Sequence, residues 1–201
     1  MRNTLLFIFG WLLIVLPELL RIYFIMPFPG SQADETISFA YFLHRYIFFF
    51  LVAGVLMIVF PLFHYMIHGK WFQKIASIFF AAVAMIVFLM TTRVMQADKM
   101  FLQPRHKIIT ASVANSVSLD RLVIGVAING DACCYPIQII GYHHQVRDTV
   151  GGTPLIATYC TVCRTGRVYS PYINGQLQHF RLVGMDHFNA MLEDETSKSW
   201  W

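Results

Sequence analysis

Hydrophobic residues are concentrated in three long runs in the first half of the chain. The runs cover residues 4–26, 46–67 and 75–95. A helix needs about 20 apolar residues to cross the hydrocarbon core of a bilayer, so each run is long enough for one transmembrane helix. The first run is too long for the core of a signal peptide, which has about 7–15 residues. Residues 1–95 are therefore predicted to form a transmembrane helical region, and the lipid bilayer is the partner that it binds.

From Leu122 onward the pattern changes to short β-branched runs separated by turn residues. Strands are expected at residues 122–128, 132–140, 155–159 and 177–183, with a further extended segment at 167–169. Asn129-Gly130 and Asn174-Gly175 are hairpin signals, because tight two-residue turns need residues that tolerate positive φ. Residues 122–201 are therefore predicted to form a small, mainly antiparallel β domain, joined to the membrane region by a connector at residues 96–121.

The composition supports a membrane protein and argues against nucleic-acid binding. Apolar residues make up 57% of the chain and charged residues 13%, with a formal net charge of +4. Soluble domains usually have about 25% charged residues. The sequence has no block or stripe of basic residues, which a nucleic-acid interface would need.

The Lys and Arg residues of the short loops predict the orientation in the membrane. Arg2 precedes the first run, and Lys70 and Lys74 lie in the loop between the second and third runs. The first loop instead carries Asp34 and Glu35. Cytoplasmic loops are enriched in Lys and Arg, so the N-terminus is predicted to be cytoplasmic. Three crossings then place the β domain outside the cytoplasm. The membrane is predicted to be a plasma or inner membrane.

Two charged residues, Glu18 and Arg21, interrupt the first hydrophobic run. Three residues apart, they lie on one face of a helix and can pair. A charge at mid-membrane costs about 2.5–3.5 kcal/mol on insertion scales, so such residues are candidates for function. Alternatively, both lie near the outer end of the helix, after Pro17, and reach toward the lipid headgroups.

The sharpest signal for chemistry is Cys160-Thr161-Val162-Cys163. Two cysteines three residues apart can direct both sulfurs to one point, which suits a disulfide, a redox-active dithiol or a shared metal. A predicted strand precedes the pair, and Gly166 with a β-like run follows it, which is typical of a metal-binding knuckle. Zinc or copper would be the expected metal, because Cys and His ligands suit both.

Further ligands or disulfide partners for this pair must come from elsewhere in the domain. His143 and His187 are the candidate metal ligands that would complete a site with the two cysteines. Cys133 and Cys134 could instead form disulfides with the pair, which would be ordinary outside the cytoplasm. A bond between these two neighbours would be strained.

Three functions are compatible with these residues. The first is a membrane-tethered extracytoplasmic domain whose Cys160/Cys163 site, with His143 and His187, binds a soft metal or exchanges disulfides. The second is a structural or interaction subunit of a membrane complex, with membrane-protein partners and cysteines used as disulfide staples. The third, a hydrolase using Asp186 and His187, has less support because no serine elbow or second base accompanies them.

Five short motifs follow one another in a characteristic order in the second half of the chain. They are Val123-Ile124-Gly125-Val126, Tyr135-Pro136, the segment His143–Asp148, Gly151-Gly152-Thr153-Pro154 and Tyr159-Cys160-Thr161-Val162-Cys163. This order resembles the prokaryotic domain of unknown function 3179 family, and the resemblance covers about residues 122–201. The family has no known activity, so the resemblance implies a domain type and not a reaction.

Some positions match the family pattern and others depart from it. The matching positions are Cys160, Cys163, His143 and Asp148. The departures are His144 where Glu is usual, Thr161 where Pro is common, Arg164 where Gly is frequent and Arg147 where Asn is frequent. The family pattern also continues into a G-x-A-I-x-G-P-like segment, so the resemblance implies that this chain is truncated at its C-terminus.

Overall fold

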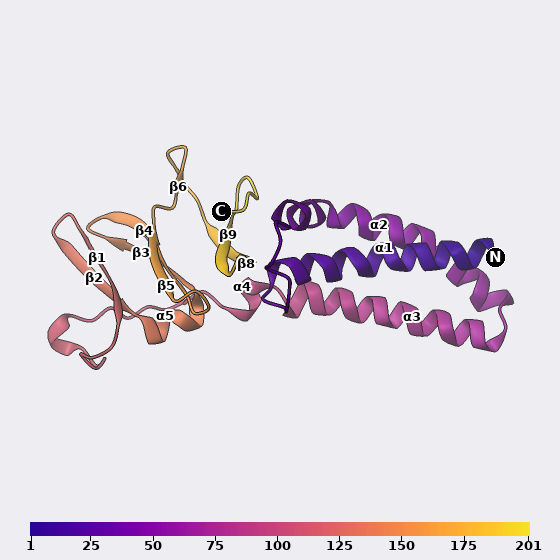
Figure 1. Cartoon of the computed structure of the whole chain (residues 1–201), viewed down its shortest axis with the longest axis horizontal. Coiled ribbons are helices and arrows are strands. Elements are labelled where there is room, and N and C mark those ends of the chain that lie inside the picture. The colour runs from indigo at the N-terminus through magenta and orange to yellow at the C-terminus, as the bar shows by residue number, and fades with distance from the viewer. The chain divides into compact units, whose positions relative to one another are not determined.

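The computed structural model describes all 201 residues, and the chain divides into two compact units. The first unit, Met1–Gln96, is helical, and the second, Ala97–Trp201, contains all the strands (Figure 1). Three long apolar helices followed by a domain of small antiparallel sheets is the fold class that the sequence predicts, and it is confirmed.

The first unit consists of three helices that are long and apolar enough to cross a membrane. They are α1 (Arg2–Ile25), α2 (Ile37–His68) and α3 (Trp71–Leu89), and α3 continues as a π-helical turn, η1 (Met90–Val94). Helix α2 begins earlier than the second hydrophobic run. Residues 37–45 contain neither Gly nor Pro, so nothing in them breaks the helix.

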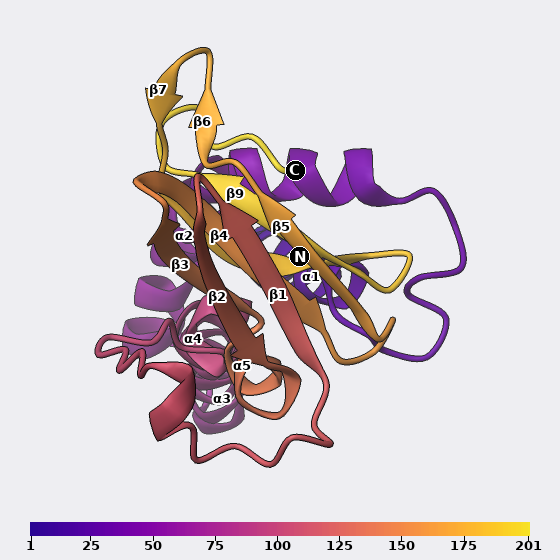
Figure 2. The same cartoon turned by 90° about the vertical axis from the view of Figure 1, so that its left-hand side faces the viewer.

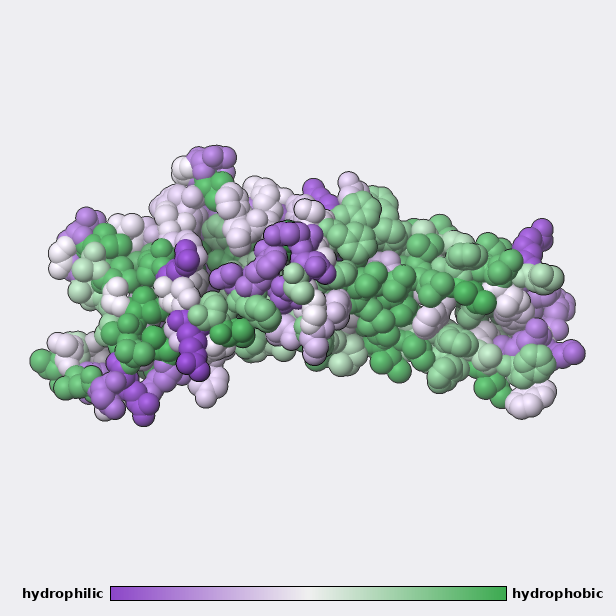
Figure 3. All heavy atoms as spheres, viewed as in Figure 1, coloured by the Kyte–Doolittle hydropathy of each residue, from purple (hydrophilic) through white to green (hydrophobic).

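Helices α1 and α2 pack closely where two glycines face each other. A Cβ atom added to Gly10 would lie 2.8 Å from the carbonyl oxygen of Gly54, and one added to Gly54 would lie 2.7 Å from that of Gly10. Small residues allow such close packing in membrane proteins. There, van der Waals packing drives helix association, because the lipid tails are as apolar as the side chains and no hydrophobic effect favours it. The outer faces expose large apolar side chains such as Phe48 and Leu56, and hydrophobic residues cover most of this unit in Figure 3.

The charged pair of α1 is enclosed within the helical unit. Glu18 and Arg21 are only 1% and 5% exposed, and the Arg21 guanidinium donates to Glu18 Oε2 at 2.8 Å. Arg21 Nη1 also lies 3.4 Å from Nδ1 of His44 on α2. The pair therefore links α1 to α2 inside the unit and does not extend outward.

The second unit is built from β-hairpins and short helical turns. Its elements are α4 (Ala97–Met100), η2 (Ser112–Ala114), β1 (Val123–Ile128), β2 (Asp131–Pro136), α5 (Ile137–His143), β3 (Gln145–Val150), β4 (Thr153–Cys160), β5 (Thr165–Tyr169), β6 (Tyr172–Ile173), β7 (Gln176–Leu177), β8 (Phe180–Asp186) and β9 (Asn189–Asp194). All strand pairs are antiparallel: β1 with β2, β3 with β4 with β5, β6 with β7, and β8 with β9.

Both Asn-Gly hairpin turns that the sequence predicts are present. Asn129 and Gly130 connect β1 to β2 with φ values of 52° and 86°, and Asn174 and Gly175 connect β6 to β7 with 50° and 76°. Positive φ at both central residues matches the right-handed twist of the flanking strands. Local turn chemistry therefore determines these two hairpins.

The predicted strand from Ala132 to Ile140 is wrong in its second half. Strand β2 ends at Pro136, and residues Ile137–His143 form helix α5. Proline has no N–H for a ladder, and its φ of −63° suits the start of a helix. The helix buries Ile140, which is 1% exposed, in the core of the domain.

The three-stranded sheet β3-β4-β5 separates two interiors, because alternate residues of a strand face opposite sides. On one side Leu155 and Ala157 of β4 join the core formed with β2 and α5. On the other side Ile156, Thr158 and Cys160 line a pocket that is also lined by β8 and β9. Hairpin β1–β2 therefore covers one face of this sheet and hairpin β8–β9 the other (Figure 2).

Candidate functional site

The two cysteines of the C-x-x-C motif lie at the tip of the β4–β5 hairpin. Cys160 is the last residue of β4 and pairs with Thr165, the first residue of β5. The four residues between them form the turn, which includes Cys163. Arg164 has a φ of +51°, a conformation that favours glycine. A glycine at this position would adopt the same conformation without the strain that Arg164 bears.

The two cysteines lie side by side, but their thiols occupy different environments. Cys160 is 6% exposed, and its thiol donates to the carbonyl oxygen of Phe188 at 3.4 Å. Cys163 is partly exposed, and its backbone N–H donates to Cys160 Sγ at 3.5 Å. The turn thus presents one accessible sulfur with a second, covered sulfur directly beside it.

Burial and hydrogen bonding shift the pKa values of the two thiols in opposite directions. Burial raises the pKa of Cys160, and its contact with the Cys163 thiol adds to the increase. Burial also acts against ionisation of Cys163, but hydrogen bonds from the Cys160 thiol and from Thr165 outweigh it and lower the pKa of Cys163. Because the thiolate is the reactive form, Cys163 is the better nucleophile of the pair.

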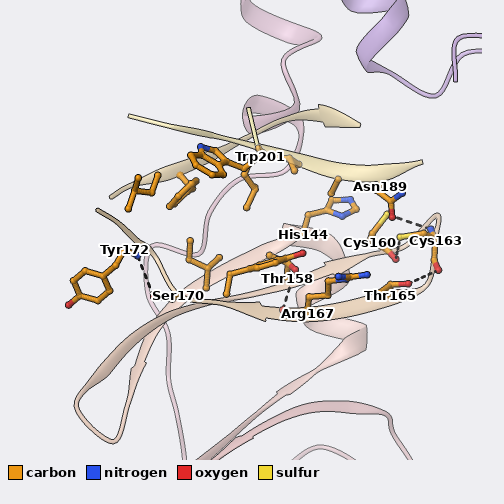
Figure 4. Close-up of a pocket in the computed structure, with 17 residues that line it drawn as sticks. His144, Thr158, Cys160, Cys163, Thr165, Arg167, Ser170, Tyr172, Asn189 and Trp201 are labelled. Carbon is orange, nitrogen blue, oxygen red and sulfur yellow. Dashed lines mark hydrogen bonds between the residues drawn. The ribbon is translucent and has the colours of Figure 1, made fainter. Parts of the chain in front are cut away.

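Both cysteines line a pocket of about 290 Å³ between the sheet and hairpin β8–β9. In Figure 4 the cysteines lie at one end of this pocket, Tyr172 lies at the other, and Trp201 lies above it. Most of the lining is aliphatic or aromatic, and the only permanently charged side chain in it is Arg167. The pocket is therefore an apolar chamber that opens beside a pair of thiols.

His144 also lines this pocket, next to the cysteines in Figure 4. It is 8% exposed and has a φ of +60°, which is rare for a residue with a side chain. Its Nδ1–H donates to the carbonyl oxygen of Tyr159 at 2.9 Å, so the neutral ring keeps Nε2 as an acceptor. Burial lowers the pKa of His144 and favours this neutral form.

His143, and not His144, is the histidine that the sequence predicts for the site. The structure instead places His143 at the end of α5, where Nδ1 contacts the carbonyl oxygen of Leu102 at 2.6 Å. His143 does not line the pocket. Helix α5, part of which the sequence predicts as a strand, ends in a left-handed turn at His144, and this turn determines which ring faces the cysteines.

The other predicted site residues lie outside the pocket lining. His187 occupies the turn between β8 and β9, where Nδ1 lies 3.0 Å from Asp186 Oδ1. Cys133 and Cys134 lie on β2, the first partly buried and the second exposed. Neither is bonded to Cys160 or Cys163 in the structure, which contains four free cysteines.

The predicted ligands do not gather into one metal-binding cluster. No group of three or more His, Cys, Asp or Glu side chains is close enough together to hold a metal ion. Of the four residues predicted to share zinc or copper, the structure brings together only Cys160 and Cys163. A zinc or copper site at these four residues therefore stays a prediction.

Asp148, which matches the family pattern, anchors the connector to the sheet. Its carboxylate accepts from the Tyr135 hydroxyl at 2.9 Å and from Lys107 Nζ at 3.1 Å. Burial would raise the pKa of Asp148, but hydrogen bonds from the Thr149 N–H, Lys107 and Tyr135 outweigh it and lower the pKa. The residue faces the core side of the sheet. Its contacts indicate a structural role, in which it holds the connector and β2 against β3.

The comparisons with known proteins agree with this division of the chain. Residues 103–201 match the sequence model of a family described as "Protein of unknown function (DUF3179)". No curated protein and no solved structure matches the chain. The matched residues include the whole cysteine turn and every residue that lines the pocket. The resemblance seen in the motif order is thus confirmed, and the C-terminal domain of this chain belongs to the DUF3179 family of unknown function.

Proposed function

We propose that the protein is a membrane-anchored thiol–disulfide exchange protein, with Cys163 as the attacking thiol and Cys160 as the resolving thiol. One observation carries the proposal: a partly exposed cysteine and a buried cysteine lie side by side at the tip of one hairpin, with the Cys163 N–H 3.5 Å from Cys160 Sγ, beside an apolar pocket. A reactive dithiol needs one accessible thiolate and a second thiol that is within reach and protected from side reactions.

The spacing of the two cysteines suits a reversible bond. The Cys163 N–H lies 3.5 Å from Cys160 Sγ, so the turn already folds Cys163 back onto Cys160. A disulfide needs a Cα separation of about 4.4–6.8 Å, which two residues three apart in a turn can adopt. The turn therefore requires little movement of the backbone between the dithiol and disulfide forms.

The exchange would take place in two steps. The Cys163 thiolate attacks one sulfur of a substrate disulfide, forms a mixed disulfide and expels the other substrate sulfur, which takes up a proton. Cys160 then loses its proton and attacks Cys163 Sγ, which releases the second substrate thiol and leaves a Cys160–Cys163 disulfide. The pair loses two electrons, and the substrate disulfide is reduced to two thiols; the reverse reaction oxidises a dithiol substrate. His144 Nε2, an acceptor in the same pocket, is available for the Cys160 proton.

We propose further that the domain lies outside the cytoplasm. The three apolar helices supply the membrane anchor, and the basic residues Arg2, Lys70 and Lys74 favour a cytoplasmic N-terminus. Disulfides form and persist in oxidising compartments, where an exchange protein would find its substrates. Such an anchored domain would act close to the membrane surface, on its own or within a membrane complex.

The test uses the full chain in lipid nanodiscs, with Cys133 and Cys134 replaced by Ser so that only the pair reacts. We expect this protein to reduce an aromatic disulfide such as dithiobis(nitrobenzoate) with release of two thiols per pair. The Cys160→Ser variant should stop at a mixed disulfide on Cys163, detectable as a mass increase. The Cys163→Ser variant should react much more slowly, because the remaining thiol is buried.

Two results would contradict the proposal. A Cys160–Cys163 disulfide that forms but is not exchanged by dithiols would favour the interpretation of a structural staple. Equal reactivity of the two single variants would show that the turn does not distinguish an attacking from a resolving thiol.

A further inference from the structure

We infer that the substrate of this site is an extended polypeptide whose disulfide lies near a large apolar residue and an acidic residue, bound as an added strand on the free edge of β5. This inference rests on the proposed exchange chemistry and names the class of substrate. It is carried by the backbone of β5, the volume of the pocket and the charge of its lining.

Strand β5 has one unpaired edge. It lies at the end of the β3-β4-β5 sheet and pairs only with β4. Apart from the bonds to β4, no backbone hydrogen bond joins Thr165–Tyr169 to the rest of the chain, and all five residues are exposed. A row of unpaired N–H and C=O groups binds an extended peptide by strand addition, with main-chain hydrogen bonds for affinity and pockets for alternate side chains.

The free edge leads directly to the reactive sulfur. Strand β5 begins two residues after Cys163, so a peptide paired with β5 passes the cysteine turn. Thr165, Arg167 and Tyr169 line the pocket, since alternate residues of a strand share one face. Side chains of an added strand would alternate in the same way, so every second one would face the pocket side of the sheet.

The pocket has the volume and walls for a large apolar side chain. Its volume of about 290 Å³ is bounded by Phe180, Leu182, Leu192 and Trp201 among others. An apolar cavity of about 150 Å³ is enough to bind benzene, and pockets for whole small-molecule ligands usually begin at about 300 Å³. The pocket therefore fits one aromatic or branched side chain better than it fits a cofactor.

The charge of the lining selects a neighbouring acidic group. Arg167 is the only Lys, Arg, Asp or Glu among the lining residues. Its guanidinium has no hydrogen bond or ion pair within the chain, so its donors are available to a ligand. A carboxylate is the group that the planar guanidinium fork binds best, with two parallel hydrogen bonds.

The experiment measures exchange between the full chain in nanodiscs, with Cys133 and Cys134 as Ser, and synthetic peptides. Each peptide carries one cysteine in disulfide linkage to thionitrobenzoate, whose release is followed by absorbance. The reference peptide has Phe two residues from the cysteine and Asp two residues beyond that Phe, so that both side chains face the pocket side of the sheet. Matched peptides replace Phe by Ser, replace Asp by Lys, or methylate the backbone nitrogens that would bond to β5.

We expect the second-order rate constant of exchange to fall about tenfold or more when Phe is replaced by Ser, from the lost apolar burial. Backbone methylation should lower it by a similar factor, since two or more main-chain hydrogen bonds are lost. The Arg167→Glu variant should reverse the preference for the Asp over the Lys peptide. The Arg121→Glu variant, which alters an exposed arginine outside the pocket lining, should keep the original preference.

Dithiobis(nitrobenzoate) without a peptide separates the two ways in which the idea can fail. If it reacts with the pair but the four peptides react at equal rates, the substrate inference is overturned and the exchange function stands. If neither it nor any peptide forms the Cys160–Cys163 disulfide, the exchange function fails and the inference fails with it.

Discussion

Replacement of Asp194 by Asn tests how the end of strand β9 is held together. Asp194 is 1% exposed, and its carboxylate accepts from the backbone N–H and hydroxyl groups of Ser197, the Ser199 N–H at 3.2 Å and Trp201 Nε1 at 3.0 Å. Burial alone would raise the pKa of Asp194, but these hydrogen bonds hold it well below its usual range. The carboxylate thus ties the residues after β9 back onto the hairpin, and Trp201 lies over the pocket in Figure 4.

The geometry sets the size of the effect. Three of the donors point to Oδ2 and the Ser197 N–H points to Oδ1. An asparagine can keep its carbonyl oxygen toward the three donors only by turning its NH₂ toward the Ser197 N–H. The partly buried Ser197 N–H is then left without an acceptor, which costs about 1–3 kcal/mol. The other bonds become neutral and weaken by a similar total, so we expect a loss of about 3 kcal/mol in the free energy of unfolding.

The assay is urea unfolding of the domain within the full chain in nanodiscs, followed by tryptophan fluorescence. Because the pKa of Asp194 is lower in the folded than in the unfolded protein, its charge stabilises the fold fully above about pH 5. That contribution is lost as the pH falls through the unfolded and then the folded pKa. The difference between wild type and Asp194→Asn should therefore be constant from about pH 5 to 8 and shrink below about pH 4.

Asp186→Asn is the matched control on the same hairpin. Asp186 is partly exposed and contacts the His187 ring at 3.0 Å, so its replacement should cost less than about 1 kcal/mol. Equal stability of Asp194→Asn and wild type at pH 7 would refute the reasoning. A difference that persists undiminished at pH 2–3 would also refute it, since the protonated carboxyl would then be as effective as the charged one.

Three further changes test other parts of the structure. Iodoacetamide should modify Cys163 well before Cys160 at pH 8, because Cys160 is buried and its pKa is raised; peptide mass spectrometry measures both rates. Glu18→Gln should lower the resistance of the helices to unfolding in dodecyl sulfate by about 3–5 kcal/mol, because it leaves the buried Arg21 charge uncompensated. Replacement of both residues by Leu should recover much of that loss. Gly166→Ala should lower domain stability by about 1–3 kcal/mol in urea, because the added Cβ atom would lie 2.8 Å from an isoleucine methyl group of β1; an unchanged midpoint would show that β1 can move aside.

The three long apolar helices and two of the hairpins could be predicted because their signals are local. A run of about 20 apolar residues needs only length and composition to be recognised as a membrane span. The Asn129-Gly130 and Asn174-Gly175 turns need only two adjacent residues that accept positive φ, and all four of these residues have positive φ in the structure. The C-x-x-C turn is equally local, since the spacing alone brings Cys160 and Cys163 together.

Helix α5 and the position of His144 could not be predicted in this way. The residues Ile137–Ile140 are apolar at every position except Gln138, so periodicity cannot separate a buried strand from one buried helical turn. A strand at this run would not fix which of the two histidine side chains faces the pocket side of the sheet. The choice between His143 and His144 depended on the left-handed turn at the end of α5, which packing of Ile140 into the core selects.

What the sequence determined by itself is therefore the division into long apolar helices and a β domain, the position of the tight turns and the closeness of the two cysteines. These features depend on contacts between residues that are near each other along the chain. Only the tertiary structure decided that Cys160 is buried and Cys163 accessible, that His144 joins them, and that a pocket opens beside them. Those features arise where hairpin β8–β9 packs over strands β4 and β5, and no local pattern specifies which faces meet.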